Sequence, residues 1–189
     1  MYVYEQIPKA LETERCIDPM GDKKSKKYLY LGTLGLAAVL ALVGHLFVPI
    51  SRLYDVGGIG QFVLRAVLIA AAAVLYYCVY ELVRSRVCEK LTGRKTKITL
   101  RKYWLNSSSE SIFTLKGYLL YSLAPVAIIG IVLLILNIAL PDQFFWQVYI
   151  IQIINIAGAT GDFYAAYRLV REKKPLAVTD DGEKITYRT

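Results

Sequence analysis

The chain has 189 residues, 56% of them hydrophobic, with a mean hydropathy of +0.41 and a net charge of +8. This apolar share exceeds that of a soluble domain of the same length. The apolar residues also come in long unbroken runs and not at the spacing of an amphipathic helix, which excludes a soluble protein with a large core. The composition therefore indicates an integral membrane protein.

Four apolar runs predict four transmembrane helices, at 28–50, 59–83, 118–140 and 144–167. A helix needs about 20 residues to cross a hydrocarbon layer of about 30 Å, and each run is long enough. The first run is too long, and starts too far along the chain, for a cleavable signal peptide. The predicted fold class is all-α, with a membrane domain at 28–170, a loop at 84–117, and tails at 1–27 and 171–189.

The basic residues predict on which side of the membrane each loop lies. Of the 23 Lys and Arg residues, six precede the first helix, nine lie between the second and third, and six follow the fourth. With four helices these segments share one side, which the positive-inside rule assigns to the cytoplasm together with both termini. Topology and attraction to anionic lipid account for the positive charge, so we expect a lipid bilayer and no nucleic acid as a partner. The thiols of Cys16, Cys78 and Cys88 lie on or near that side, where they stay reduced, and no disulfide is expected.

Two segments outside the predicted helices have the character of strands. Residues 95–104 alternate in polarity, which predicts a short strand. Residues 176–187 form two apolar stretches around Asp180, Asp181 and Gly182, the pattern of a β-hairpin. An isolated hairpin is only marginally stable in water, so we expect it to pair with the strand at 97–104 or to lie on the lipid surface. The sequence thus predicts a small cytoplasmic β-element beside the four helices.

Ionisable and polar residues at membrane depth mark the candidate site, because they are rare there and face a partner or a cavity. Glu81 and Asp162 lie near the cytoplasmic ends of the second and fourth helices, where the two carboxylates can meet. Asn155, Gly158 and Asp162 follow one another at three- and four-residue steps. This spacing predicts a polar face of small residues that allows close approach of the second helix.

These residues resemble those of the putative zincin peptidases, small bacterial multi-pass membrane proteins related in outline to the site-2 proteases. In that family an H-E-x-x-H helix end is followed by a basic loop with a strand, two further helices, and a late Asn-x-x-Gly-(Ser/Ala)-x-Gly-Asp segment. The chain has this last segment from Asn155 to Asp162, and the resemblance covers about residues 67–187. It implies a bacterial plasma membrane and a zinc site with two histidine ligands, a glutamate as general base and an aspartate as third ligand.

The chain departs from this pattern at both histidine positions, which are Tyr80 and Arg84. Arginine has no lone pair to donate and stays protonated, and a neutral tyrosine is a poor ligand. We therefore expect no bound metal and no cofactor, zinc being the exception if the chain is active after all. The candidate site implied by the resemblance consists of Glu81 as remnant general base, of Tyr80, Arg84 and Asp162 as remnant metal positions, and of Asn155, Gly158 and Gly161 in support.

Three functions stay open at this point. We favour a non-catalytic relative of the membrane metallopeptidases that binds or regulates other membrane proteins. An active zinc peptidase would need further ligands, and the chain offers His45, Cys78 and Cys88. A small channel or transporter subunit would use the polar membrane residues as an ion path. For His45 itself we expect a structural role, and for Arg65 contact with the outer headgroups.

The loss of zinc would leave two carboxylates facing each other. We expect the guanidinium of Arg84 to replace the metal by bridging Glu81 and Asp162, with Tyr80 or Asn155 donating a further hydrogen bond. The alternative is an exposed interfacial pair between Glu81 and Arg84, three residues apart on one helix. A nitrogen of Arg84 within about 4 Å of an Asp162 oxygen distinguishes the two.

Overall fold

The computed structural model describes residues 2–8, 11, 13–18, 21, 23–55, 57–93, 97–101, 104–172, 176–181 and 184–189, with the backbone alone at 24, 97–101 and 104–110. The chain divides into two compact units. The sheet unit comprises Met1–Leu29, Tyr80–Pro125 and Gly161–Thr189. The helix unit comprises Tyr30–Val79 and Val126–Thr160.

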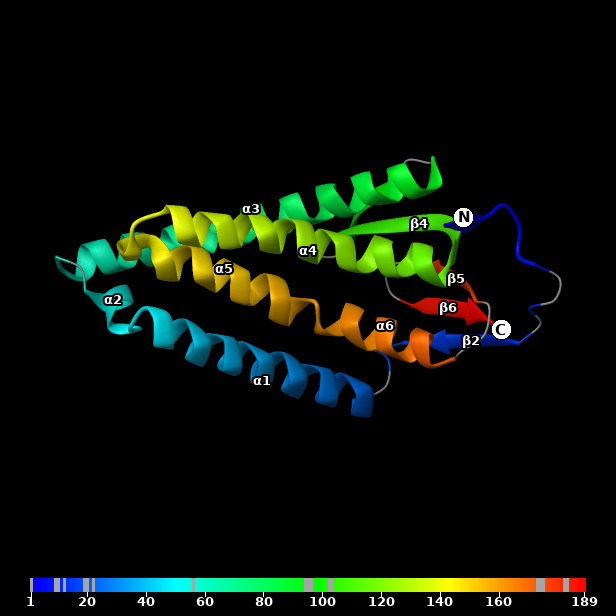
Figure 1. Ribbon diagram of the computed structural model, residues 1–189, viewed down its shortest axis with the longest axis horizontal. Coiled ribbons are helices and arrows are strands. Elements are labelled where there is room, and N and C mark those ends of the chain that lie inside the picture. The colour runs from blue at the N-terminus through cyan, green and yellow to red at the C-terminus, as the bar shows by residue number, and fades with distance from the viewer. Residues whose placement is uncertain are drawn as a thin grey trace. The chain divides into compact units, whose positions relative to one another are not determined.

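Within the described residues, four helical segments are long and apolar enough to cross a membrane, as the sequence predicted, so the chain is a multi-pass membrane protein (Figure 1). A short helix, α2 (Ser51–Tyr54), follows the first of them. In chain order the four segments are α1 (Lys23–Phe47), α3 (Ile59–Thr92), α4 (Leu115–Ala139), and a composite of the 3-10 turn η1 (Asp142–Phe144), α5 (Phe145–Gly158) and α6 (Thr160–Arg171).

Helix α3 continues past its predicted end at residue 83 as far as Thr92. It ends at Gly93, whose φ of 70° is favoured by glycine and whose N–H donates to the carbonyl of Glu89 at 2.8 Å. This is a common way to end a helix. The apolar run stops earlier because only the part of a helix inside the membrane needs apolar side chains. The helix itself can continue beyond that part.

The fourth segment is not the single helix that was predicted for 144–167, because it is interrupted at Ala159. At this break the hydroxyl of Thr160 donates to the carbonyl of Ala157 at 2.6 Å. A Cβ added at Gly158 would meet no side chain or neighbouring helix within 4 Å, so this glycine does not mark the close helix contact that its spacing from Asn155 and Asp162 predicted. Gly161 is equally open. Both glycines lie next to the break, and glycine readily adopts the backbone conformations that such a break requires.

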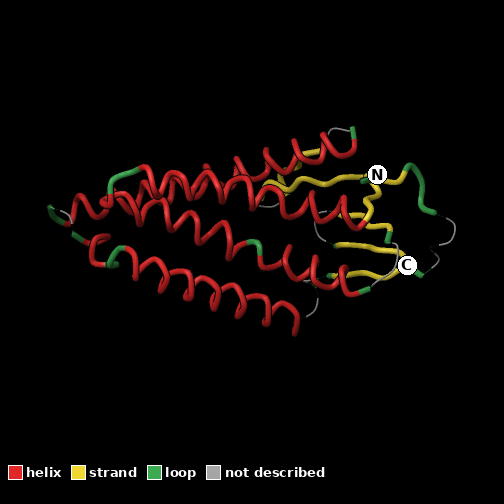
Figure 2. Tube along the Cα trace, in the orientation of Figure 1, coloured by secondary structure: helices red, strands yellow, loops and turns green. Residues whose placement is uncertain are grey.

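The strands form one six-stranded antiparallel sheet, larger than the predicted strand and hairpin (Figure 2). The predicted hairpin is present as β5 and β6, although Gly182 of its expected turn lies outside the described residues. The hairpin pairs through β5 with β4 (Trp104–Thr114). The strand predicted at 97–104 is β3 (Lys97–Arg101), and it pairs with β4 and not with the hairpin. The expected tail at 1–27 also contributes β1 and β2. The six strands are β1 (Val3–Tyr4), β2 (Glu14–Ile17), β3 (Lys97–Arg101), β4 (Trp104–Thr114), β5 (Ala177–Asp180) and β6 (Ile185–Arg188), in the order β1-β4-β5-β6-β2.

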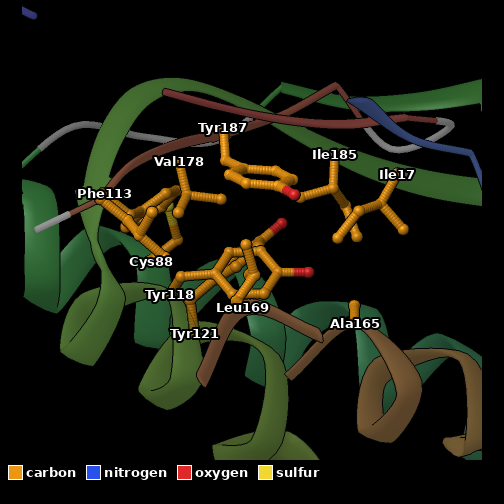
Figure 3. Close-up of a cluster of buried hydrophobic side chains, with 11 residues drawn as sticks. Ile17, Cys88, Phe113, Tyr118, Tyr121, Ala165, Leu169, Val178, Ile185 and Tyr187 are labelled. Carbon is orange, nitrogen blue, oxygen red and sulfur yellow. The ribbon is translucent and has the colours of Figure 1, made fainter. Parts of the chain in front are cut away.

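The core of the sheet unit lies between the sheet and the parts of α3, α4 and α6 that belong to this unit (Figure 3). The rings of Phe113 on β4 and Tyr121 on α4 stack with their centroids 5.0 Å apart. Tyr118, Tyr121 and Leu169 are fully buried on the helix side, as is Val178 on the sheet side. This apolar layer surrounds the polar residues of the candidate site.

Several polar side chains in the helix unit bind backbone groups of α1 and of the connection that follows it. The indole N–H of Trp146 on α5 donates to the carbonyl of Val48 at 3.1 Å, and the hydroxyl of Tyr149 donates to the carbonyl of Leu40 at 2.9 Å. Nδ1 of His45 accepts the N–H of Ile50 at 3.0 Å at the end of α1. These bonds satisfy polar groups that lipid cannot. The bond of His45 stabilises the end of α1.

The start of α4 yields a first prediction. Thr114 caps this helix by accepting the N–H of Gly117 at 3.2 Å, and a Cβ at Gly117 would overlap the carbonyl of Tyr2. Gly117→Ala should lower stability by about 1–3 kcal/mol through this overlap. Gly35→Ala on α1, where a Cβ meets nothing within 4 Å, is the matched control and should leave stability unchanged or raise it. Melting temperatures of the two variants in one detergent provide the comparison, and equal values would contradict the close approach of Tyr2.

Candidate functional site

Arg84 on α3 lies at the centre of a polar cluster in the sheet unit. Its Nη2 is 3.2 Å from Oδ2 of Asp180 on β5 and 4.0 Å from Oδ1 of Asp162 on α6. The side chains of Arg84, Asp162 and Asp180, which we call the Arg84 cluster, are 13%, 21% and 5% exposed. Charges this far from water are costly unless each is paired and hydrogen-bonded. The surroundings of the two carboxylates therefore decide whether the cluster is stable.

Asp162 accepts hydrogen bonds at both carboxylate oxygens. The hydroxyl of Ser122 on α4 donates to Oδ1 at 2.7 Å, and the hydroxyl of Tyr80 on α3 donates to Oδ2 at 3.3 Å. Asp162 also lies in the first turn of α6. The positive end of the helix dipole and the free N–H groups there favour a negative charge. The break before α6 thus gives Asp162 a setting that the interior of a continuous helix would not provide.

The guanidinium of Arg84 packs against an aromatic ring as well. Its Cζ lies 4.7 Å from the centroid of the Tyr121 ring, which is fully buried and stacked on Phe113. An arginine over an aromatic face in a desolvated position is stabilised by about 2 kcal/mol or more. The aromatic core therefore helps to hold the guanidinium beside the two carboxylates.

Asp180 is the member of the cluster whose role the sequence did not reveal. It was read as part of the hairpin turn, but it is the last residue of β5, and 4% of it is exposed. A signal for it exists in the strand alternation, because Asp180 and the fully buried Val178 are two residues apart and therefore share a face. An aspartate on the core face of a strand needs a cationic partner. Which of the many basic residues supplies it could not be read from the sequence.

Among the described residues, the structure contains the expected contacts of Arg84 and Tyr80 with Asp162, but not the expected ion pair of Arg84 with Glu81. The predicted approach of Arg84 to Asp162 is present at 4.0 Å, and the predicted hydrogen bond comes from Tyr80. Glu81 is buried, with 4% of it exposed. In the described part of the chain, the ion pairs of Arg84 lead to Asp162 and Asp180, so the bridge to Glu81 that was expected is replaced by one to Asp180. An exposed pair between Glu81 and Arg84 is excluded by the burial of both side chains.

Asn155 belongs to the helix unit and supports the packing there. It is fully buried, its Oδ1 accepts from the hydroxyl of Tyr76 on α3 at 3.1 Å, and its amide donates to the carbonyl of Val126 on α4 at 3.0 Å. The predicted contact between the second and fourth helices is present at this residue. A Cβ at Gly130 would lie 3.2 Å from its amide nitrogen, so α4 also comes close here.

The zinc ion that the resemblance implies does not fit these residues. Among the side chains that the structure describes, no three His, Cys, Asp or Glu groups come together as metal ligands. Arg84 holds a fixed positive charge against both Asp162 and Asp180, which repels a divalent cation from the carboxylates. Both oxygens of Asp162 already accept hydrogen bonds. The described residues form an ion-pair network into which a divalent cation does not fit.

Comparison with known proteins gives one match. A family model described as putative zincin peptidase matches residues 73–176, more than half of the chain. The match includes Tyr80, Glu81, Arg84 and Asp162, while Asp180 lies beyond it. No curated protein and no solved structure matches the chain at the significance required.

The Arg84 cluster yields the second prediction. Asp180→Asn removes one of the two negative charges that face Arg84 without changing the size of the side chain. Because it breaks a buried pair from one side, it should lower stability by about 3 kcal/mol. The control is Glu14→Gln, which breaks the pair between Glu14 and Arg188, whose side chains are 55% and 37% exposed. This exposed pair should cost under about 1 kcal/mol. Thermal or denaturant unfolding compares them, and equal losses would contradict the importance of the buried pair.

Proposed function

We propose that this chain, which belongs to the family of putative zincin peptidases, is a non-catalytic member that binds or regulates other membrane proteins. The observation that supports the proposal is the position of Arg84, where the family's pattern has its second histidine, paired with Asp162 and Asp180. Arginine stays protonated at physiological pH and has no lone pair for a metal. A scaffold that keeps its fold without the metal can still bind a partner.

The alternative of an active zinc peptidase needs ligands from elsewhere in the chain, and two of the three candidates, His45 and Cys88, are bound or buried elsewhere. Nδ1 of His45 accepts the backbone N–H of Ile50. Cys88 is fully buried in the apolar core of the sheet unit. Glu81 then has no metal-bound water to activate, because a general base of this type acts on a water whose pKa a metal has lowered. These contacts favour the non-catalytic reading.

The third prediction tests catalysis through metal content. The purified protein should contain no stoichiometric zinc, and it should not cleave peptides. Glu81→Gln, which would remove a general base, should leave any background cleavage unchanged. Elemental analysis and a peptide-cleavage assay measure both quantities. Zinc that is lost on Asp162→Asn, or cleavage that is lost on Glu81→Gln, would overturn the proposal.

A sharper form of this test restores the two histidines. Tyr80→His together with Arg84→His removes the fixed charge and places two imidazoles at the i and i+4 positions of one helix face. The double variant should gain zinc affinity that neither single variant shows, because two imidazoles on one face are needed beside the carboxylate of Asp162. Isothermal titration calorimetry with zinc measures the affinity of each variant. Equal affinity in a single variant would contradict the assignment of these positions.

The proposal places the protein in a bacterial plasma membrane with both termini in the cytoplasm. Support comes from the number of apolar helices, which is even, and from the basic residues that gather in segments on one side. The fourth prediction follows. Cys16, which is exposed, should resist a membrane-impermeant maleimide in intact cells, whereas a cysteine introduced at Asp55, whose side chain is 75% exposed, should react. The reverse pattern would invert the topology, and labelling of both would contradict the four spans.

Binding of a partner protein requires its own experiment. A photo-crosslinking residue at Tyr167 or Phe163, both exposed on α6, reports what lies beside this helix in the membrane. Crosslinks to one defined membrane protein, absent from the same residue placed at Leu46 on α1, would support the proposal. Crosslinks to lipid alone from both α6 positions would contradict binding at this surface.

A further inference from the structure

The helix unit contains a groove of about 550 Å³ between α3, α4 and α5. Its lining follows one face of α3 from Arg65 to Val79 at helical spacing. The lining from α4 and α5 also repeats every three or four residues and is mostly apolar. Apolar exposure alone says little in a membrane protein, because every lipid-facing helix has it. The groove differs from such a surface by its concave form and by its distribution of polar groups.

The length of the groove suits a hydrocarbon chain. The stretch from Arg65 to Val79 is about 21 Å long at 1.5 Å per residue. The hydrocarbon layer of a bilayer is about 30 Å thick, so the chains of one leaflet extend over about 15 Å. The groove is therefore long enough to hold one acyl chain of a single leaflet.

The polar groups of the lining gather at one end. Arg65 is in the second turn of α3, and Gln147 is in the first turn of α5. The guanidinium of Arg65 donates to the carbonyl of Arg52 at 3.2 Å, which holds it beside the connection between α1 and α3. Tyr76, further along, turns its hydroxyl to Asn155 and leaves its ring for the groove. A cation at one end and an apolar channel along the rest match the polarity of a phospholipid.

We propose that this groove binds one phospholipid, with an acyl chain along α3, α4 and α5 and its phosphate at Arg65. The sequence predicted only that Arg65 contacts the outer headgroups. In the structure its guanidinium is also held at the mouth of the groove by the carbonyl of Arg52. Its remaining N–H groups are donors of the kind that bind phosphate oxygens. The lipid belongs to the leaflet on the Arg65 side of the membrane.

Titration of the purified protein with phosphatidylglycerol in mild detergent, followed by native mass spectrometry, tests this proposal. The wild type should form a saturable complex with one lipid. Ala72→Phe fills the groove at the middle of its α3 face and should weaken binding at least about tenfold by taking the space of the chain. The control is Ala71→Phe, at an exposed residue that does not line the groove, and it should bind as the wild type does.

The phosphate contact has its own pair of variants. Arg65→Gln should weaken phosphatidylglycerol binding about fivefold, as expected for one basic residue near an anionic surface. Arg52→Gln, at a side chain that is 61% exposed and paired with Asp55, should have no effect because only the Arg52 backbone holds Arg65. Diacylglycerol, which has the chains but no phosphate, should bind more weakly than phosphatidylglycerol and should not respond to Arg65→Gln.

Several outcomes would overturn the proposal. These are the absence of a saturable complex, equal binding by Ala72→Phe and Ala71→Phe, equal binding of the two lipids, and a second copy of the chain or another polypeptide in place of the lipid. Melting temperatures verify that the variants are folded. If Ala72→Phe does not fold, the smaller Ala72→Leu takes its place, and Arg65→Gln tests the other end of the groove independently.

Discussion

The sheet unit depends on one buried interaction, the pairing of the Arg84 guanidinium with the carboxylates of Asp180 and Asp162. It connects α3 with a strand of the sheet and with the first turn of α6. Ser122 on α4 donates to Asp162, so a third helix joins the same network. Each charge would be costly in this surrounding on its own, and together they are tolerated because each has a partner. The aromatic core, with Tyr121 against the guanidinium, holds the geometry in place.

The same interaction explains how a scaffold of a metallopeptidase family can be stable without the metal. Carboxylates gathered in a poorly solvated site repel each other unless a positive charge lies among them. A zinc ion would supply that charge in a metal site, and here a guanidinium does. The two differ in chemistry, because a metal with an open position lowers the pKa of a bound water, whereas a guanidinium only donates hydrogen bonds. A guanidinium can therefore supply the positive charge of a metal ion, but not its effect on a bound water.

The helix unit follows a different constraint, set by the lack of water around a membrane helix. Several of its polar side chains bind groups within the unit, as Asn155 does with Tyr76 and Val126, and as Trp146 does with Val48. What remains along the groove is apolar except at the end that carries Arg65 and Gln147. Polar groups at one end of an apolar channel are unfavourable beside lipid tails but favourable beside a headgroup. This is the reason that the groove suggests a phospholipid.

The sequence by itself determined the membrane class, the four apolar helices and the hairpin at the C-terminal end, because run length, turn residues and helical spacing act over a few neighbouring residues. The approach of Arg84 and Tyr80 to Asp162 was predicted from the resemblance to the zincin family, in which these positions belong to a metal site. Tertiary structure alone decided that β4 pairs with the hairpin, that the N-terminal strands join the sheet, and that Asp180 replaces Glu81 as the second partner of Arg84. Strand pairing and ion pairing join residues far apart in the chain, and many strands and basic residues could have satisfied the local pattern equally well. Only the packing of the core brings one particular pair within reach.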